Sequence, residues 1–417
     1  MNILYINHYA GSSEMGMDFR PYYLAREWVK MGHNVRIVAG DYSHLRQKNP
    51  EVCKDFQEEV IDDINYTWIK TGKYEGNGVV RAFTMFRFVY KLRANAGMIA
   101  EKWRPEVVIT SSTYPLDTYA GQKIKKKTRK QGIRQGKGAT LIHEVHDMWP
   151  ATLYEVGGMS KWNPFVVLMQ IAENSAYRHC DKCVSLLPYA EEYMLKHGLA
   201  AGKFVNIQNG IVEEDWESYE KIPSEHKNFF KEKSNKFIVG YFGGHAVSNA
   251  LDKALEVAGE FKKRDKDRIQ FVFVGDGAEK QRLINKAKSE KLNNIEFLAP
   301  INKKAIPDLL KHFDCSYMTG AGSPLYRFGL CPNKMYDSMM AALPVVCAFN
   351  TPDTLVKETG CGIQCNPEVT EEVVAAIDKI ASMSEEERKA LGKKGQKRIL
   401  KDFTYNRLAS QFAELFQ

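Results

Sequence analysis

The chain has 417 residues, 44% of them hydrophobic and 26% charged, and a formal net charge of +8. Length and composition predict a soluble globular protein of two or three domains. They exclude a membrane-spanning protein, because no apolar run approaches the roughly 20 residues that a spanning helix needs. The N-terminal segment lacks the basic region of a signal peptide, so we expect no export.

Short β-branched segments alternate with helical patterns along the whole chain. In the first half the expected strands are Ile3–Ile6, Val35–Val38, Tyr66–Ile69, Val107–Thr110, Leu141–Val145 and Cys183–Leu186. After the turn dipeptide Asn209-Gly210 the expected strands are Phe237–Tyr241, Gln270–Val274, Ile295–Leu298, Cys315–Tyr317, Val345–Cys347 and Gly362–Gln364. This alternation predicts an α/β protein with two doubly wound, Rossmann-like domains. We place one domain over residues 1–200 and the second over residues 201–402.

A helix expected over Arg81–Arg93 has apolar residues on two faces. A helix of this kind is either fully buried or has one face in the headgroup region of a membrane. The basic block described next favours the membrane interpretation. The candidate membrane face and its basic edge consist of Phe83, Phe86, Arg87, Tyr90 and Arg93.

A basic block without any acidic residue extends from Gly121 to His143. Such a block is either a solvated helix face or a surface that attracts nucleic acid or an anionic membrane. We expect no nucleic acid partner, because no aromatic interleaving or nucleic-acid motif accompanies the block. Its basic residues are Lys123, Lys125, Lys126, Lys127, Arg129, Lys130, Arg134 and Lys137.

The eight cysteines are scattered, and Cys180 and Cys183 form the single CxxC string. No second pair follows at zinc-site spacing, so we expect buried, reduced thiols rather than a metal or redox site. Reduced thiols are typical of a cytoplasmic protein.

Ligands of open α/β sheets bind beyond the carboxyl ends of the strands. In the second half, two strands run directly into glycines, at Gly243-Gly244 and at Gly275, and glycine lets the backbone approach a ligand closely. The four loops at strand ends that this rule selects are residues 7–17, 144–149, 243–249 and 275–279.

The segment Tyr326–Val346 reads as a glycine-containing turn followed by a helix that opens at Pro332 and Asn333. A helix N-terminus suits a phosphate, and a carboxylate just inside the helix can accept from ribose hydroxyls. Lys334 and Asp337 therefore indicate a nucleotide clasp. The alternative is an amphipathic helix with an ordinary capping turn.

Nearly end to end, the chain resembles the retaining nucleotide-sugar glycosyltransferases of family 4. The pattern is most similar to bacterial enzymes that assemble O-antigen, capsule or colanic-acid repeat units, which combine an HDxWP-like string with a PNK…(D/E) helix. The resemblance implies the GT-B fold, with an acceptor-binding first domain facing a donor-binding second domain across a cleft. It also implies that a C-terminal helix, residues 403–417, packs back on the first domain. The matching segments are Leu24–Gly40, His143–Gly158, Tyr241–Ala258, Phe271–Leu283 and Tyr326–Val346.

The chain departs from the family pattern at one carboxylate. The family has two glutamates eight positions apart; Asp337 matches the second, whereas Gly329 stands at the first. Either Arg327 and the backbone of residues 328–330 replace the missing side chain, or the motif supplies nucleotide binding alone. In the family an Arg/Lys pair usually binds the diphosphate; in this chain Lys334 and Arg327 would take that role.

The resemblance implies the remaining site assignments residue by residue. His146 and Asp147 would orient the sugar or acceptor and, with Asp337, form the catalytic set. His8, Gly11, Gly16 and Trp149 would line the acceptor side. The implied donor-binding residues are Gly243, Gly244, His245, Asn249, Gly275, Glu279, Arg327, Phe328, Gly329, Leu330, Asn333, Lys334 and Asp337.

No metal or other cofactor is implied, because side chains and helix dipoles would stabilise the leaving diphosphate. The only DxD string, residues 265–267, is expected to be solvated surface.

The expected function is a retaining transfer of a hexose or N-acetylated amino sugar from a nucleotide donor, UDP by family frequency. The acceptor would be a polyprenyl-diphosphate-linked glycan at the inner face of the plasma membrane, in surface polysaccharide synthesis. Two alternatives stay open: a nucleotide-sugar epimerase or hydrolase on the same fold, and a non-catalytic nucleotide-sugar-binding partner.

Overall fold

The computed structural model describes residues 1–16, 20–76, 78–264 and 268–417. The chain divides into two compact units, Met1–Gln208 with Tyr405–Gln417 and Asn209–Thr404. No helix within the described ranges is long and apolar enough to cross a membrane. The DxD string at 265–267, and Met17 of the first predicted loop, lie outside the described residues.

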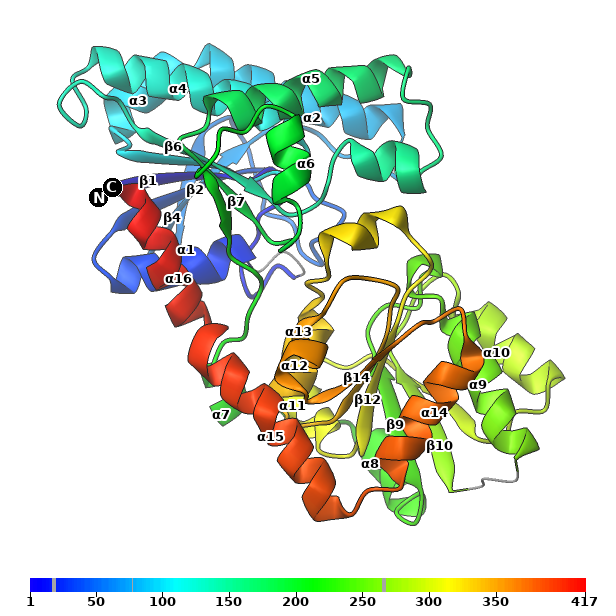
Figure 1. The fold of residues 1–417 in the computed structure, drawn as a ribbon. Coiled ribbons are helices and arrows are strands. Elements are labelled where there is room, and N and C mark those ends of the chain that lie inside the picture. Colours follow the sequence, from blue (N-terminus) through cyan, green and yellow to red (C-terminus); the bar gives the residue numbers. More distant parts are fainter. Residues whose placement is uncertain (17–19, 77, 265–267) are drawn as a thin grey trace. The chain divides into compact units, whose positions relative to one another are not determined.

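The first unit contains an eight-stranded sheet in the order β3-β4-β2-β1-β5-β6-β7-β8 (Figure 1). Only the pairing of β3 with β4 is antiparallel. The strands are β1 Asn2–Ile6, β2 Asn34–Gly40, β3 Gln57–Ile61, β4 Ile64–Ile69, β5 Val107–Thr110, β6 Thr140–Val145, β7 Lys182–Ser185 and β8 Phe204–Asn206. The helices are α1 Arg20–Lys30, α2 Val79–Ala94, α3 Ala96–Trp103, α4 Thr118–Lys130, α5 Pro164–His179, α6 Glu191–Lys196 and α16 Tyr405–Ala413.

The second unit contains a six-stranded, fully parallel sheet in the order β11-β10-β9-β12-β13-β14. The strands are β9 Phe237–Phe242, β10 Ile269–Val274, β11 Ile295–Leu298, β12 Cys315–Thr319, β13 Val345–Ala348 and β14 Gly362–Cys365. The helices are α7 Glu214–Glu217, α8 Ser224–Glu232, α9 Leu251–Lys263, α10 Lys280–Ser289, α11 Ile306–Leu310, α12 Asn333–Met340, α13 Leu355–Thr359, α14 Thr370–Ala381 and α15 Glu385–Asp402. The predicted fold class, two α/β domains with parallel sheets, is confirmed.

Each sheet has one point at which the chain reverses its winding direction. In the first unit β1 leads outward to β2, whereas β5 leads the other way to β6, so the reversal lies between β1 and β5. In the second unit it lies between β9 and β12. Ligands of open α/β sheets bind at the carboxyl ends of the strands beside such a reversal. The loops after these strands are therefore the candidate ligand-binding regions.

Helix α16 packs on α1 in the first unit, as Figure 1 shows in red and blue. The Trp28 indole is fully buried, and its Nε1–H donates to the Ala409 carbonyl at 3.0 Å. Its ring lies 5.2 Å from that of Phe412, centroid to centroid. Buried aromatic area of this kind is strongly stabilising, so the chain's last helix belongs to the core of the unit in which the chain begins.

Candidate functional sites

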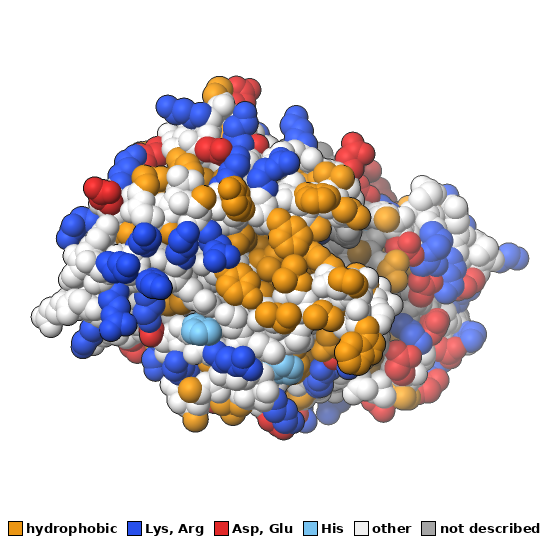
Figure 2. Space-filling model, turned by 90° about the horizontal axis from the view of Figure 1, so that it is seen from above, with side chains coloured by type: hydrophobic (Ala, Val, Ile, Leu, Met, Phe, Trp, Pro, Cys, Tyr) orange, Lys and Arg blue, Asp and Glu red, His pale blue; other side chains and the backbone are white. Residues whose placement is uncertain are grey.

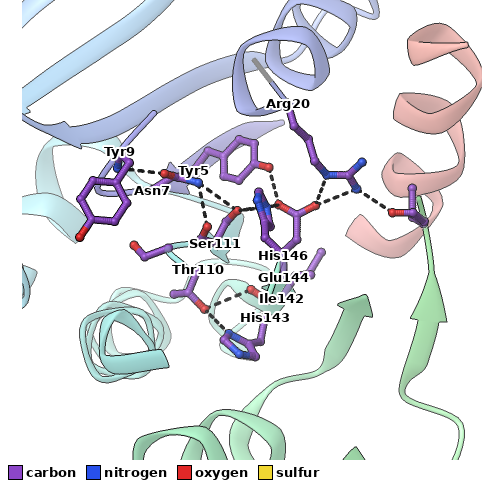
Figure 3. A network of polar contacts seen from close by, with 12 residues as sticks. Tyr5, Asn7, Tyr9, Arg20, Thr110, Ser111, Ile142, His143, Glu144 and His146 are labelled. Atoms are coloured by element: carbon purple, nitrogen blue, oxygen red, sulfur yellow. Dashed lines mark hydrogen bonds and ion pairs between the residues drawn. The ribbon is translucent and has the colours of Figure 1, made fainter. Parts of the chain in front are cut away.

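A buried carboxylate organises the first unit at its winding reversal. Glu144, near the end of β6, is fully buried. Its Oε2 accepts hydrogen bonds from the hydroxyls of Tyr5 at 2.5 Å and Ser111 at 2.6 Å, and its Oε1 lies 2.9 Å from the Arg20 guanidinium (Figure 3). Burial by itself would raise the pKa of Glu144, but Arg20, His146 and these hydrogen bonds outweigh burial and hold the pKa well below its usual range.

His146 is held by this carboxylate through one ring nitrogen. Its Nε2 lies 2.9 Å from Glu144 Oε2 and 2.9 Å from Ser111 Oγ. In the neutral ring the nitrogen that faces the carboxylate carries the proton, and the other nitrogen, Nδ1, is the acceptor. Nδ1 makes no hydrogen bond to any described residue, and 13% of the side chain is exposed. The arrangement presents an oriented imidazole, with a hydrogen-bond acceptor, just beyond the carboxyl end of β6.

Arg20 extends the network beyond Glu144. Its guanidinium also donates to the carbonyls of Ile207 at 2.9 Å and Gln208 at 2.6 Å, the last two residues of the unit's main segment. Sequence reasoning missed Arg20 and Ser111, and it noted Glu144 without a role. A carboxylate inside a fully buried strand, β6, was the available signal for Glu144; none pointed to Arg20.

Asp147 and Trp149 follow His146 in a tight turn. One Asp147 oxygen, Oδ1, accepts the Met148 N–H at 2.8 Å and the Thr152 hydroxyl at 2.8 Å, so the carboxylate caps the turn that follows β6. The Trp149 ring is partly buried and lies edge-on to Phe165, with centroids 6.4 Å apart. The structure therefore brings Asp147 and Trp149 beside His146, with Asp147 already engaged in local structure.

His8 occupies the interior of the first unit rather than a surface. Its ring is fully buried between Tyr9 and Phe88, each 4.5 Å away, and its Nδ1 lies 2.7 Å from the Tyr114 hydroxyl. Burial, followed by the charges of Arg46 and Arg81, holds its pKa well below the ordinary value. A packed, neutral imidazole does not favour the acceptor contact expected from the sequence.

Gly11 and Gly16 lie in the loop after β1 and serve its backbone. The Gly11 carbonyl accepts the Tyr66 hydroxyl at 2.8 Å. Gly16 has a φ of +97°, and a Cβ there would lie 3.0 Å from the Gln47 nitrogen. Both glycines shape the loop, and no side chain of theirs can contact a ligand.

Two glycine loops of the second unit, after β9 and β10, interlock beside its winding reversal. The His245 N–H donates to the Asp276 carbonyl at 2.8 Å, which joins the loop after β9 to the loop after β10. A Cβ on Gly275 would lie 1.9 Å from the Gly243 carbonyl oxygen, and one on Gly277 would lie 2.4 Å from the His245 oxygen. Only glycine permits this approach of two backbones.

Lys334 points from α12 toward these loops. Its Nζ donates to the Tyr241 hydroxyl at 3.0 Å and to Asn249 Oδ1 at 3.2 Å, and it lies 3.4 Å from the position of a Cβ on Gly243. Among the described residues no carboxylate pairs with it. Burial lowers the pKa of Lys334 to about 8. A desolvated ammonium held only by neutral groups is a ready site for an anion.

His245 and Asn249 lie beside this lysine. The His245 ring is fully buried, and neither of its nitrogens has a hydrogen-bond partner among the described residues. Burial, followed by Lys280, lowers its pKa to about 4, so the ring is neutral. The Asn249 amide also donates to the Gly244 carbonyl at 2.9 Å, which fixes the lysine's acceptor. Sequence reasoning missed Tyr241, which contacts Lys334. Tyr241 belongs to β9, and the sequence of that strand indicates only a buried core strand.

Asp337 lies one turn further along α12, which opens at the exposed Asn333. Its partly buried carboxylate makes no hydrogen bond to the rest of the described chain. Burial raises the pKa of Asp337 to about 6. A partly buried carboxylate without a hydrogen-bond partner in the described chain is unusual in a purely structural helix.

Other predicted donor residues differ in how they are placed. The Arg327 guanidinium lies 4.2 Å over the Phe328 ring and donates to the Pro324 carbonyl, and the chain then turns at Gly329 with a φ of +94°. Leu330 follows, partly buried, before α12. Glu279 contributes only backbone to the loops, because its carboxylate accepts from Arg282 at 2.6 Å.

The candidate membrane face lies exposed on α2. Phe83 and Tyr90 are 63% and 72% exposed, and Phe86 is 36% exposed. Figure 2 shows apolar side chains gathered on this face of the first unit, flanked by lysines and arginines. Arg87 donates to the Thr71 carbonyl, and Arg93 lies 5.7 Å from the Tyr119 ring. The helix therefore has the exposed apolar face that the sequence indicated.

Comparisons with known proteins match both units. The profile of Glycosyltransferase Family 4 matches residues 16–215, and that of Glycosyl transferases group 1 matches residues 224–398. A search of curated protein sequences finds no significant match.

Similar solved structures cover almost the whole chain. They include sucrose-phosphate synthase from Thermosynechococcus elongatus, with 16% identity, a TM-score of 0.72 and coverage of 100% of this chain and 98% of the other. Anabaena HepE in complex with UDP and glucose has 16% identity, a TM-score of 0.65 and coverage of 99% and 98%. A trehalose-6-phosphate structure from E. coli, bound with UDP-2-fluoro glucose, has 12% identity, a TM-score of 0.71 and coverage of 100% and 99%. The chain is a glycosyltransferase with the GT-B fold, in which a family 4 domain precedes a group 1 domain.

Proposed function

We propose that this glycosyltransferase moves a hexose or N-acetylated amino sugar from a UDP-sugar to a polyprenyl-diphosphate-linked glycan, with retention at the anomeric carbon. One observation carries the proposal: an ammonium, Lys334, is held by neutral groups beside two interlocked glycine loops. That arrangement suits the diphosphate of a nucleotide sugar.

The donor assignment rests on the second unit. The diphosphate would contact Lys334 and the main-chain N–H groups of the loops after β9 and at the start of α12, and Asp337 would accept from the ribose hydroxyls. HepE and the E. coli structure were solved with UDP or a UDP-sugar, which supports UDP as the nucleotide. With Lys334 and the helix N-terminus to stabilise the leaving diphosphate, we propose that transfer needs no metal.

The proposed chemistry uses no protein nucleophile. The bond between the anomeric carbon and the diphosphate oxygen breaks, and the acceptor oxygen bonds to the same face of that carbon. The acceptor proton passes to the departing phosphate. His146, held by Glu144, would accept through Nδ1 from a non-reacting hydroxyl of the acceptor or the sugar and so orient that molecule for the same-face transfer.

The lipid-linked acceptor is supported by the surface of the first unit. The face formed by Phe83, Phe86 and Tyr90 is exposed, and the part of the basic block up to Lys130 lies on the neighbouring α4. An apolar face flanked by basic residues suits an anionic membrane surface, and this supports the proposed location at the inner face of the plasma membrane. The product would be a repeat unit of a surface polysaccharide.

Radiolabelled UDP-sugars, supplied with and without polyprenyl-diphosphate-linked glycan, test the proposal. We expect label to enter the lipid only when both substrates are present. Donor epimerised or hydrolysed without acceptor would favour the second enzyme class. Binding without any product would favour a non-catalytic partner, and transfer only to a soluble sugar phosphate would contradict the lipid acceptor.

Replacing His146 by alanine should leave the fold intact and lower kcat by about 100-fold, because the ring orients a substrate while Glu144 keeps its ion pair with Arg20. Steady-state kinetics together with circular dichroism check this result. A variant with wild-type turnover would remove His146 from the site.

Asp337→Asn should stabilise the free protein at pH 7 by about 1–2 kcal/mol while weakening UDP binding. The pKa of Asp337 is about 6 in the folded state, above its ordinary value, so the folded protein binds this proton more tightly than the unfolded chain does. Stability from this group is therefore full below about pH 4 and is lost as pH rises toward 6.

Urea unfolding at pH 4.5 and pH 7.5 checks this prediction. The free energy of unfolding of the variant should exceed that of the wild type only at the higher pH. If variant and wild type were equally stable at both pH values and bound UDP equally well, the Asp337 carboxylate would neither destabilise the free protein nor bind the nucleotide.

Removing Phe83 and Tyr90 together, by alanine, should weaken binding to anionic vesicles by about tenfold, because both rings lie in the proposed membrane face. Added salt should weaken wild-type binding further, since the basic residues act through charge. Val60→Ala, an equally exposed position on the edge strand β3, is the control. Binding that resists both salt and the double substitution would contradict membrane attachment here.

A further inference from the structure

The first unit contains an open apolar groove of about 820 Å³ beside the HDxWP segment. One wall is the first two turns of α2, with Val79, Ala82 and Phe86; the other is the stretch from Trp149 to the start of α5, with Leu153. All of its described lining residues belong to the first unit.

Several apolar side chains around the groove are exposed to solvent and so add little to the packing of the core. Val79 is 71% exposed, Phe83 63% and Val156 56%. Exposed apolar surface of this extent marks a place where another apolar body binds. The orange region of Figure 2 is this face of the first unit.

The groove is continuous with the residues that hold the proposed acceptor site. Trp149 and Thr152 line it, and the Thr152 hydroxyl donates to Asp147 at 2.8 Å. Asp147 directly follows His146, whose free Nδ1 is the proposed contact to the acceptor or sugar. A molecule in the groove would therefore have one end beside His146.

The charged residues around the groove indicate which kind of molecule it binds. Of its described lining residues only Arg81 is charged, and the guanidinium lies 5.4 Å from the Tyr9 ring. Further along, α2 and α4 present Arg93 and Lys123 beside Tyr119. An occupant with a long apolar body and an anionic group fits this distribution.

We propose that the groove binds the hydrocarbon chain of the lipid-linked acceptor and so positions its diphosphate-linked glycan at His146. This inference rests on the proposed lipid acceptor and adds where its chain lies. It predicts that the chain is recognised by the protein itself, without a membrane.

Soluble acceptor analogues with one glycan, one diphosphate and alkyl chains of increasing length test the proposal in the absence of vesicles. KM should fall by up to about fourfold for each methylene that becomes buried, until the groove is filled. Ala82→Phe, which blocks the groove, should raise KM for the long-chain analogue toward the short-chain value. Ala94→Phe, the same change on α2 outside the groove, should keep the wild-type profile.

The outcomes separate the two proposals. No transfer to any analogue or to the natural type of acceptor would overturn the proposed function itself. Transfer with a KM that ignores chain length, or an Ala82→Phe profile equal to the wild type, would overturn the groove alone.

Photolabelling gives a readout that needs no substitution. An analogue with a diazirine in its chain, bound to the wild-type enzyme, should label residues 149–165 and the start of α2. Label confined to the outer face around Tyr90 would show that the chain enters a membrane surface instead, and would overturn the proposal.

Discussion

Glu144→Gln is expected to lower the free energy of unfolding of the first unit by about 3 kcal/mol, because it leaves the buried Arg20 without its charged partner. A loss of this size lowers the midpoint of that unit's thermal transition by roughly 10 °C. Scanning calorimetry measures it. Transfer should fall as well, since the amide no longer fixes the tautomer of His146.

The pH dependence has a definite sign. The pKa of Glu144 is depressed in the folded state, so its contribution to stability is present above the ordinary carboxyl pKa of about 4.3 and is lost as pH falls below it. The gap between wild type and Glu144→Gln should therefore stay constant near neutral pH and close in acid. A gap that widened in acid would contradict the assignment.

Arg20→Met combined with Glu144→Gln is the matched control. Removing both charges should restore much of the stability that the single change loses, because no ion then remains unpaired in the core. Activity should stay low, since His146 still lacks its carboxylate. If the double variant were as unstable as the sum of the single variants, the two residues would not act as a pair.

Lys334→Met should weaken UDP binding by about 100-fold, since a charge-assisted hydrogen bond to the diphosphate is lost. The stability of the free protein should stay equal or rise, because the substitution removes an ammonium that burial disfavours. Thermal unfolding with and without UDP measures both effects. A purely structural lysine would give the opposite result: lower stability and unchanged UDP affinity.

The pKa of Lys334 adds a second signature. It is about 8 in the free protein, so part of the population is uncharged at pH 8. A bound diphosphate favours the charged form, and UDP binding near pH 8 should therefore take up a proton. Wild-type affinity should fall as pH rises above about 8, whereas the affinity of Lys334→Met should not change over that range.

The sheets could be predicted from the sequence because parallel strands are buried, β-branched runs. Every expected strand occurs, with ends within two residues of the prediction. The two missed strands lack that signal: β3 is an antiparallel edge strand whose residues are exposed or partly buried, and β8 has only three residues. The structure ends the first main segment at Gln208, shortly after β8, the last strand of the sheet.

The candidate sites could be predicted only in part. The rule that ligands bind beyond strand ends selected the loops of Gly243 and Gly275 and the start of α12, since backbone position follows from strand order. Side-chain partners do not follow from it: Arg20 meets Glu144 across 124 positions of sequence. His8 illustrates the converse, because no local pattern shows that Tyr9 and Phe88 enclose it.

Calorimetric titration of the folded protein with UDP, and with uridine as the comparison, tests the central claim that the second unit holds a nucleotide diphosphate. One UDP should bind per chain, and much more tightly than uridine, because Lys334 and the loop N–H groups meet the diphosphate. Absence of binding by both UDP and GDP, or equal affinity for UDP and uridine, would contradict the account.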